Sequence, residues 1–315
     1  MSRSQKLPSV LKLLLIVSAT LASLPVVRAA EEPISTAIAS VVSKDYVRSK
    51  LPNGSFQPET YAFGLGGYWS GDTSDKSIDG HPFMEVAKVI ASPLQLQNYL
   101  PTNDAKTTKL LIMVYWGTTI PPRAATETMA FQNAASTMAA LQRAKSASMP
   151  RQPTTSDAIK GIRGSVQGPP DEENAATSAM MALQAENAMR RRIDVKNASM
   201  LGYDSLWDAT ANLEGTPLDT RRNDMLDELE EGRYFVVLMA YDFQLMWKEK
   251  KHKLLWETRF SISQHRHAFD RELPAMALSA ARYFGQDSHG LVRKPLQENV
   301  TLGELKILGI EPDNK

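Results

Sequence analysis

Residues 233–263 read RYFVVLMAYDFQLMWKEKKHKLLWETRFSIS, and this stretch decides the fold. Apolar side chains alternate with other residues on both sides of the charged segment 248–253, which is typical of strands with one buried face. The first run places one set of side chains on a common face: Phe235, Val237, Met239, Tyr241, Phe243, Leu245 and Trp247. The second run does the same with Leu254, Trp256, Thr258, Phe260 and Ile262. Two such runs around a short polar tip predict an antiparallel β-hairpin.

Two further strands are expected before this hairpin. Tyr61, Phe63 and Leu65 alternate with small or polar residues, which predicts a half-buried strand. Residues 108–117, TKLLIMVYWG, form an unbroken apolar run, which is typical of a strand covered on both faces. We therefore place this strand at the centre of the sheet.

Two amphipathic helices are expected to pack on the sheet. The first begins at Pro82, with a break expected at Pro93, where Ser92 would cap a further turn. Its apolar stripe is Phe83, Val86, Ala87, Ile90 and Leu94. The second ends at Gly285, and its stripe is Leu273, Met276, Ala277, Ala280, Ala281 and Phe284.

Residues 120–231 are rich in Ala, Met, Gln and charge, and they predict a helical insertion. Helices are expected over 124–147, 171–198 and 219–231, with a long exposed loop at 148–170. The first two helices carry large apolar residues: Phe131, Met138, Leu141, Met180, Leu183 and Met189. These residues are interpreted either as core packing between the two helices or as an adaptable docking surface.

The order strand, helix, strand, insertion, strand, strand, helix predicts an α+β fold. We expect a mixed sheet of about four strands with the two amphipathic helices on one face. The domain would comprise 59–119 and 232–285, with a lead-in segment at 30–58 and a C-terminal tail at 286–315. The tail sequence VTLGELKILGI offers one more edge strand.

Residues 1–29 have the organisation of a secretory signal peptide. Arg3, Lys6 and Lys12 precede an apolar run, and Val27 and Ala29 satisfy the small-residue requirement for cleavage after Ala29. Polar residues interrupt the run, which disfavours the alternative of a retained membrane anchor. The sequence therefore predicts export to the periplasm or the exterior, with no transmembrane span after cleavage.

Composition excludes several classes of site. The chain has no cysteine, which removes thiol nucleophiles, iron–sulfur clusters and cysteine zinc ligands. The first 29 residues hold four basic and no acidic residues, so the remainder carries 32 basic and 35 acidic residues, a formal net charge of −3. This balance gives no indication of nucleic-acid binding, and no cofactor is expected.

The stretch ISQHRHAFDREL, residues 262–273, is the best candidate for a metal site. His265 and His267 would project from one face of a strand, and Asp270 or Glu272 would be the next ligands. Counting along the strand, however, places both histidines on its polar face and predicts that both are solvated. Asp270 is then expected to cap the following helix, with Glu272 as a first-turn acid.

Three other motifs are weaker. Gly64, Gly66 and Gly67 do not match a phosphate-binding glycine loop and are interpreted as turn residues beside Trp69. A calcium loop would need closer oxygen ligands than the following set provides: Asp72, Asp75, Asp79 and His81. The consecutive residues Asp287, Ser288 and His289 cannot form a catalytic relay, because its members must converge from different parts of a fold. The basic tip 248–253 is interpreted as a solvated hairpin end.

Four segments resemble small bacterial envelope proteins and lipoproteins of unassigned function: TYAF at 60–63, TTKLLIMVYWGTT at 107–119, KLLWETRFSIS at 253–263 and ALSAARYFG at 277–285. The chain departs from them in lacking a lipid-anchor cysteine and in carrying the insertion. The resemblance implies no active-site residues. The leading hypothesis is a non-enzymatic binding or scaffold module of the envelope that presents its insertion and basic tip to a partner. The alternative is a metal-assisted hydrolase using His265, His267 and Asp270.

Overall fold

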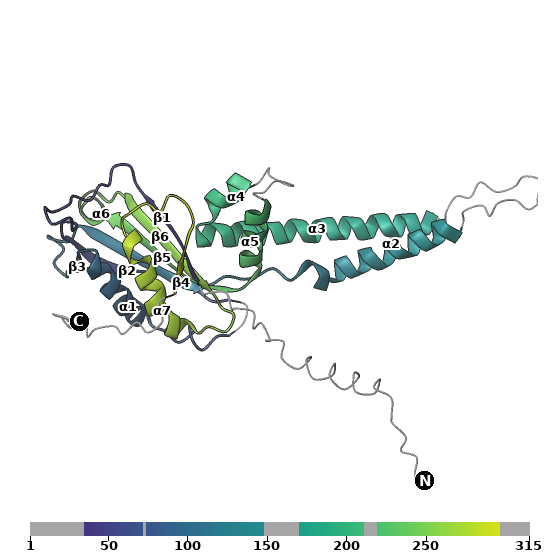
Figure 1. Cartoon of the computed structure of the whole chain (residues 1–315), viewed down its shortest axis with the longest axis horizontal. Helices are drawn as coiled ribbons and strands as arrows, with labels where there is room; N and C mark the ends of the chain where they lie inside the picture. The colour runs from purple at the N-terminus through teal and green to yellow at the C-terminus, as the bar shows by residue number, and fades with distance from the viewer. Residues whose placement is uncertain (1–34, 72–73, 148–169, 211–218, 297–315) are drawn as a thin grey trace, which may run out of the picture. The chain divides into compact units, whose positions relative to one another are not determined.

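The computed structural model describes residues 35–71, 74–147, 170–210 and 219–296, and within them seven strands form one mixed sheet in the order β3-β2-β4-β5-β6-β1-β7 (Figure 1). The strands are β1 (Ser35–Val42), β2 (Glu59–Trp69), β3 (Tyr99–Pro101), β4 (Leu110–Thr118), β5 (Arg233–Asp242), β6 (Leu254–Ser263) and β7 (Val292–Pro295). The helices are α1 (Phe83–Leu96), α2 (Met129–Ala147), α3 (Pro170–Leu201), α4 (Asp204–Thr210), α5 (Asp219–Glu230), α6 (Phe243–Glu249) and α7 (Phe269–Ala280), with short 3-10 turns at Ala125–Glu127 and Ala281–Tyr283. The strand β2 runs parallel to β3 and β4, and all other pairs are antiparallel.

The α+β class is confirmed, but a sheet of about four strands is wrong. The four expected strands correspond to β2, β4, β5 and β6, and β1, β3 and β7 join them. The strand β1 lies in the expected lead-in segment, and β7 lies in the expected tail. The buried residues of β1 include small polar ones. The Ser40 Oγ lies 2.7 Å from the Thr258 Oγ1 of β6 and donates to the Tyr283 carbonyl at 2.9 Å. Such a strand lacks the apolar alternation that reveals a strand in sequence.

The antiparallel pairing of β5 with β6 is confirmed, with Val236 opposite Phe260. The expected continuation of the first strand to Trp247 is wrong, because the chain turns into α6 after Asp242. The Asp242 side chain accepts a hydrogen bond from the Leu245 N–H at 2.9 Å, which caps the new helix. Lys250 then ends α6 in the left-handed conformation, with φ of 59°.

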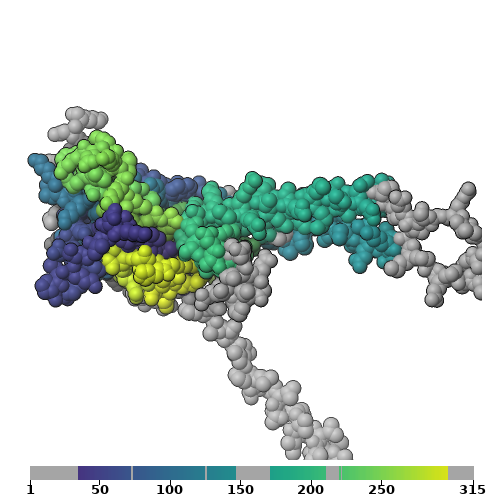
Figure 2. Space-filling model, turned by 90° about the horizontal axis from the view of Figure 1, so that it is seen from above, coloured from purple at the N-terminus to yellow at the C-terminus, as the bar shows by residue number. Residues whose placement is uncertain are grey.

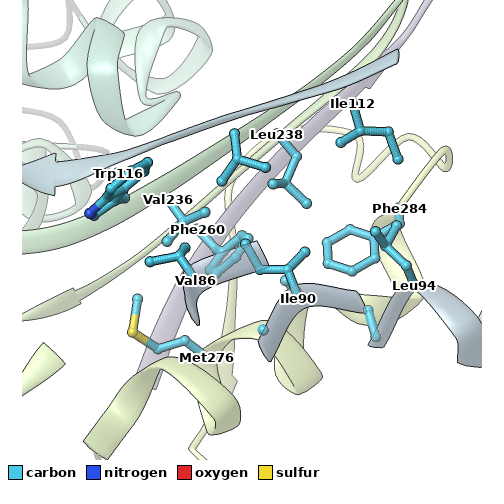
Figure 3. Packing of buried hydrophobic residues seen from close by; sticks show 14 of the residues in the cluster. Val86, Ile90, Leu94, Ile112, Trp116, Val236, Leu238, Phe260, Met276 and Phe284 are labelled. Carbon is cyan, nitrogen blue, oxygen red and sulfur yellow. The ribbon is translucent and has the colours of Figure 1, made fainter. Parts of the chain in front are cut away.

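Helices α1 and α7 cover one face of the sheet, as expected. Val86, Ile90 and Leu94 of α1 face the buried side chains of β5 in one core cluster (Figure 3). Those β5 side chains are the even-numbered ones, Tyr234, Val236, Leu238 and Ala240. The expected break at Pro93 is wrong, since α1 continues through it to Leu96. Only three residues follow Pro93, so the cost of the missing N–H falls in the final turn.

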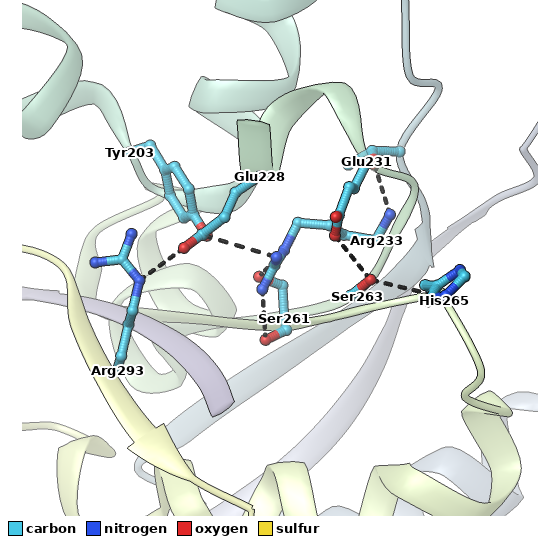
Figure 4. A network of polar contacts seen from close by, with 9 residues as sticks. Tyr203, Glu228, Glu231, Arg233, Ser261, Ser263, His265 and Arg293 are labelled. Carbon is cyan, nitrogen blue, oxygen red and sulfur yellow. Dashed lines mark hydrogen bonds and ion pairs between the residues drawn. The ribbon is translucent and has the colours of Figure 1, made fainter. Parts of the chain in front are cut away.

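The insertion covers part of the opposite face. Leu201 of α3, Tyr203, and Met225 and Leu229 of α5 are buried there against Phe235 and Val237 of β5 and Ala37 of β1. A polar network closes this layer, in which Glu228 of α5 contacts Arg233, Arg293 and Tyr203 (Figure 4). The insertion also contains α4, which was not expected from the sequence.

Several expectations fall outside the described residues. They are the signal peptide at 1–29, most of the loop at 148–170, Asp72, and the tail strand beyond Leu296. Across the residues that are described, no helix combines the length and the hydrophobicity needed to cross a bilayer.

Candidate functional site

Two loops that are far apart in sequence meet beyond the carboxyl ends of β2 and β6. The loop after β2 leads into α1, and the loop after β6 leads into α7, so both helices begin at the carboxyl ends of strands that point the same way. The Ser77 hydroxyl accepts a hydrogen bond from the first N–H of α7, on Phe269, at 3.0 Å. The Tyr234 hydroxyl of β5 contacts both loops, donating to Asp75 and lying 3.4 Å from the His267 carbonyl. We call the described residues of these two loops, 70–71, 74–82 and 264–268, the loop edge. They contain most of the residues that the sequence offered as metal ligands.

The carboxylates of the loop edge already have partners. Asp75 accepts hydrogen bonds from Tyr234 and from the Ser77 N–H, and Asp79 accepts from Tyr68, Ser74 and the Asp75 N–H. Each of the four carboxylate oxygens therefore has an internal donor, and these side chains hold the loop in place. This arrangement favours a structural role over ligand binding.

The pKa values of these groups follow from the same contacts. Burial raises the pKa of Asp75, but hydrogen bonds from Tyr234 and Ser77 outweigh it and leave the value below the usual range. The hydrogen bond from Tyr68 lowers the pKa of Asp79. Burial and the hydrogen bond to Asp75 raise the pKa of Tyr234 to about 12. Both acids are thus held ionised and Tyr234 is held protonated at neutral pH.

The two histidines of the ISQHRHAFDREL stretch have different environments. His265 is exposed, as expected, in the turn after β6. The prediction that His267 is solvated is wrong: its side chain is 11% exposed, and its Nδ1 lies 3.5 Å from Glu272. Counting along the strand fails because β6 ends at Ser263, and Arg266, with φ of 63°, then redirects the chain. The histidines therefore do not share a face.

The acids of the same stretch also divide. Glu272 lies in the first turn of α7, as expected. Asp270 lies in that turn as well, but Ala268 occupies the cap position and Ser77 provides the capping oxygen, so the capping prediction for Asp270 is wrong. Among the described residues, no group of three or more His, Asp or Glu side chains is arranged to hold a metal ion.

The remaining motifs have structural explanations. Gly64, Gly66 and Gly67 lie inside β2, so the turn interpretation is wrong. A Cβ at Gly66 would lie 2.5 Å from the Tyr115 ring, which rests directly on this position. The Ser288 hydroxyl accepts from the Ser40 N–H at 2.8 Å, while His289 is exposed beside Asp287. His81 pairs with Glu85 at 3.0 Å.

Sequence reasoning missed a partly exposed apolar surface on the sheet. We call it the open sheet face, and it consists of Trp69, Leu111, Met113, Tyr115, Met239 and Tyr241. These residues alternate with the buried side chains under α1 and α7, so they point to the opposite side. Leu111 pairs with Tyr241, and Met113 pairs with Met239, across β4 and β5. The Trp69 ring of β2 lies 5.5 Å from the Tyr115 ring.

The open sheet face adjoins the part of the sheet that the insertion covers, where Tyr115 and Met239 pack against the second core. The unbroken apolar run at 108–117 suggested cover on both faces, yet Leu111, Met113 and Tyr115 remain partly exposed. On β6, the Glu257 and Arg259 side chains pair at 2.7 Å and form a charged border. The surface has an aromatic and methionine centre with a polar edge, as protein interfaces do.

Comparison with known proteins adds no relative, because neither a family model nor a curated protein matches the chain.

Proposed function

We propose that the chain is a binding or scaffold module of a bacterial envelope, and that the open sheet face receives a protein partner. The observation that carries this proposal is the contiguous set of apolar side chains on β2, β4 and β5, with Trp69 46% exposed. Contiguous exposed apolar surface is costly in water and marks interaction sites on folded proteins. The loop edge, in contrast, has its polar groups paired with one another.

A partner with an apolar face fits this surface best. The six side chains carry no formal charge, and the Glu257 and Arg259 side chains on the bordering β6 pair with each other. The glycines of β2 let Met113 and Tyr115 lie flat on the strand, which gives a level surface rather than a pocket. Large aromatic and methionine side chains supply most of the binding energy at such contacts.

The envelope location rests on the N-terminal sequence and on the resemblance to envelope proteins. A basic segment, an apolar run and Ala29 fit an exported precursor. Cell fractionation followed by N-terminal sequencing tests this part. A mature chain that begins at Ala30 in the envelope or exterior fraction supports export, and an intact Met1 in the cytosol contradicts it.

Binding is tested with a matched pair of variants on β2. Trp69→Ser removes the most exposed ring of the open sheet face, whereas Leu65→Ser changes a 59% exposed side chain on the opposite face of the same strand. After cross-linking in the cells of origin, the wild type and Leu65→Ser should recover the same partner, and Trp69→Ser should lose it. Equal recovery by all three proteins would exclude the open sheet face as the binding surface.

A further inference from the structure

The helical pair α2 and α3 carries a second apolar surface, separate from the open sheet face. Helix α2 lies beside the part of α3 that is away from the sheet (Figures 1 and 2). The less exposed positions of α2 recur at alternating four- and three-residue spacing: Ala130, Ala134, Thr137, Leu141 and Ala144. Those of α3 do the same: Glu172, Ala176, Ala179, Leu183, Glu186, Arg190, Ile193 and Asn197. This heptad pattern is typical of an antiparallel coiled coil.

The seam of this coiled coil contains little apolar volume. Leu141 and Leu183 face it, which agrees with the core-packing interpretation for these two residues. Alanine occupies five of the other eleven seam positions, and five more are polar or charged. The buried seam residues are small or polar: Ala134, Ala176 and Asn197, at 3%, 5% and 1% exposure. Helices gain most of their stability from packing of an apolar face, so such a thin seam favours association with further helices.

Three large apolar side chains, Phe131, Met138 and Met180, lie instead along one flank of the pair. The ion pair of Lys145 with Glu173, at 3.6 Å, fixes the register between the helices. Seven residues further along each helix, Met138 lies at the level of Met180, and seven more bring Phe131 to the level of Asn187. Phe131, Met138 and Met180 are 37%, 46% and 40% exposed. We call these six residues the coil flank.

Charge on α3 makes the coil flank complementary to itself. Asp171, Glu172 and Glu173 lie near one end of α3, and Arg190, Arg191 and Arg192 lie towards the other. Glu173 and Arg191 are 18 residues apart, five full turns, so they share one line on the helix about 27 Å apart. Met180 lies between them on nearly the same line.

We propose that two copies of the chain associate through the coil flank, with their α3 helices antiparallel, to form a four-helix bundle. A twofold axis level with Ala182, two residues from Met180, places Glu173 of each copy opposite Arg191 of the other, at both ends of the interface. Met138 and Met180 of both copies meet at the centre and bury their exposed surface. A parallel arrangement would instead bring the acidic ends of the two α3 helices to the same level, and likewise their basic ends, which favours the antiparallel orientation.

Single-cysteine variants test this geometry, because the chain has no cysteine of its own. Met180→Cys places thiols from two copies near the axis, while Met189→Cys places one on the 64% exposed residue of the opposite flank. Under mild oxidation of the full chain, Met180→Cys should form a disulfide-linked dimer and Met189→Cys should stay uncrosslinked. Equal cross-linking of both variants would show collision rather than a defined interface and would overturn the proposal.

Sedimentation equilibrium measures the association itself. The wild type and Met189→Glu should be dimers with similar dissociation constants, and Met180→Glu should raise that constant at least about tenfold because a buried centre then carries two like charges. Circular dichroism checks that each variant keeps its helices. A wild type that stays monomeric up to submillimolar concentration, or a dimer that Met180→Glu leaves intact, would contradict the proposed interface.

Discussion

The hydroxyl of Tyr234, on β5, donates a hydrogen bond to the carboxylate of Asp75, 159 residues away in the loop before α1. The same hydroxyl lies 3.2 Å from Ser77, whose own oxygen caps α7. One phenol therefore joins the central sheet to the starting points of both core helices. The polar residues of the loop edge therefore hold the two helices on the sheet.

Replacing Tyr234 by Phe removes this donor and keeps the ring in the core. Asp75 is partly solvated, so the expected loss in the free energy of unfolding at neutral pH is about 1 kcal/mol. The low pKa of Asp75 makes its ionised form stabilising above the unfolded value of about 3.9, and that contribution disappears as the pH falls through the folded value. Urea unfolding should therefore show a difference between the two proteins that is constant near neutrality and shrinks below about pH 4.

Tyr241→Phe is the matched control for this change. Its hydroxyl lies on the open sheet face and contacts only the Met239 sulfur at 3.8 Å, among the described residues. This variant should unfold within about 0.5 kcal/mol of the wild type, without the acid dependence. If Tyr234→Phe behaves like the control at every pH, the hydrogen bond to Asp75 does not stabilise the loop edge.

The sequence revealed those elements whose burial follows a simple period. The alternation in 233–241 and 254–262 predicted β5 and β6, and three- and four-residue spacing predicted α1 and α7. The sequence did not predict β1 because most of its buried residues are small or polar: Thr36, Ala37, Ala39 and Ser40, whose hydroxyl lies 2.7 Å from that of Thr258. The helix α6 was not predicted because apolar residues continue to alternate through 243–247, as in a strand. Asp242, a typical helix-capping residue, was the signal for its start.

The candidate site was harder to predict for a related reason. The position of His267 depends on the left-handed turn at Arg266, which no periodic pattern records. The contact between the loops at Ser77 and Phe269 joins residues 192 apart, and spacing along the chain says nothing about such distances. The apolar run at 108–117 likewise looks the same whether helices or solvent cover its second face.

The Gly66→Ala variant should destabilise the sheet. The new Cβ would lie 2.5 Å from the Tyr115 ring, which must move off β2 and away from Trp69. Overpacking against a rigid ring costs about 1–3 kcal/mol. Thermal unfolding measures this loss, and the tryptophan fluorescence spectrum should shift as the environment of Trp69 changes.

Gly80→Ala separates the steric effect from the general cost of replacing glycine. Of the residues that the structure describes, none has an atom within 4 Å of a Cβ placed at Gly80. This variant should therefore be neutral or gain up to about 1 kcal/mol from a less flexible unfolded chain. Similar unfolding temperatures for Gly66→Ala and Gly80→Ala would mean that Tyr115 moves freely. The open sheet face would then be deformable rather than level.

Arg48 is buried at 7% exposure between two aromatic rings, with its guanidinium carbon 4.4 Å from the centre of Phe56 and 4.0 Å from that of Tyr99. Its Nη2 donates to the Gln97 carbonyl at 2.7 Å, while Nε and Nη1 are buried and have no hydrogen-bond partner within the described part of the chain. Arg48→Ala should lose about 3 kcal/mol of unfolding free energy through the cavity and the lost bonds.

Arg48→Met keeps the stem between the rings and removes a buried charge. Its loss should be smaller, below about 1.5 kcal/mol, because replacing a buried charge by an apolar residue of similar volume is often close to neutral. Urea unfolding of both variants decides between packing and hydrogen bonding. Equal losses would assign the stabilisation to the carbonyl bonds of Gln97 and Gln57.

Glu228 pairs with two arginines, one buried and one exposed. Their contributions to the free energy of unfolding can therefore be measured separately. The Arg233 side chain is 5% exposed and lies 3.7 Å from Glu228, whereas Arg293 is 40% exposed and lies 2.7 Å away. Glu228→Gln leaves the buried Arg233 charge uncompensated and should cost about 2 kcal/mol, below the usual range for fully buried pairs because Glu228 itself is partly exposed. Arg293→Gln breaks only an exposed pair and should cost at most about 1 kcal/mol. Calorimetric unfolding measures both losses. Equal losses would show that the pair with Arg293 accounts for the whole effect of Glu228 and that its pair with Arg233 contributes nothing.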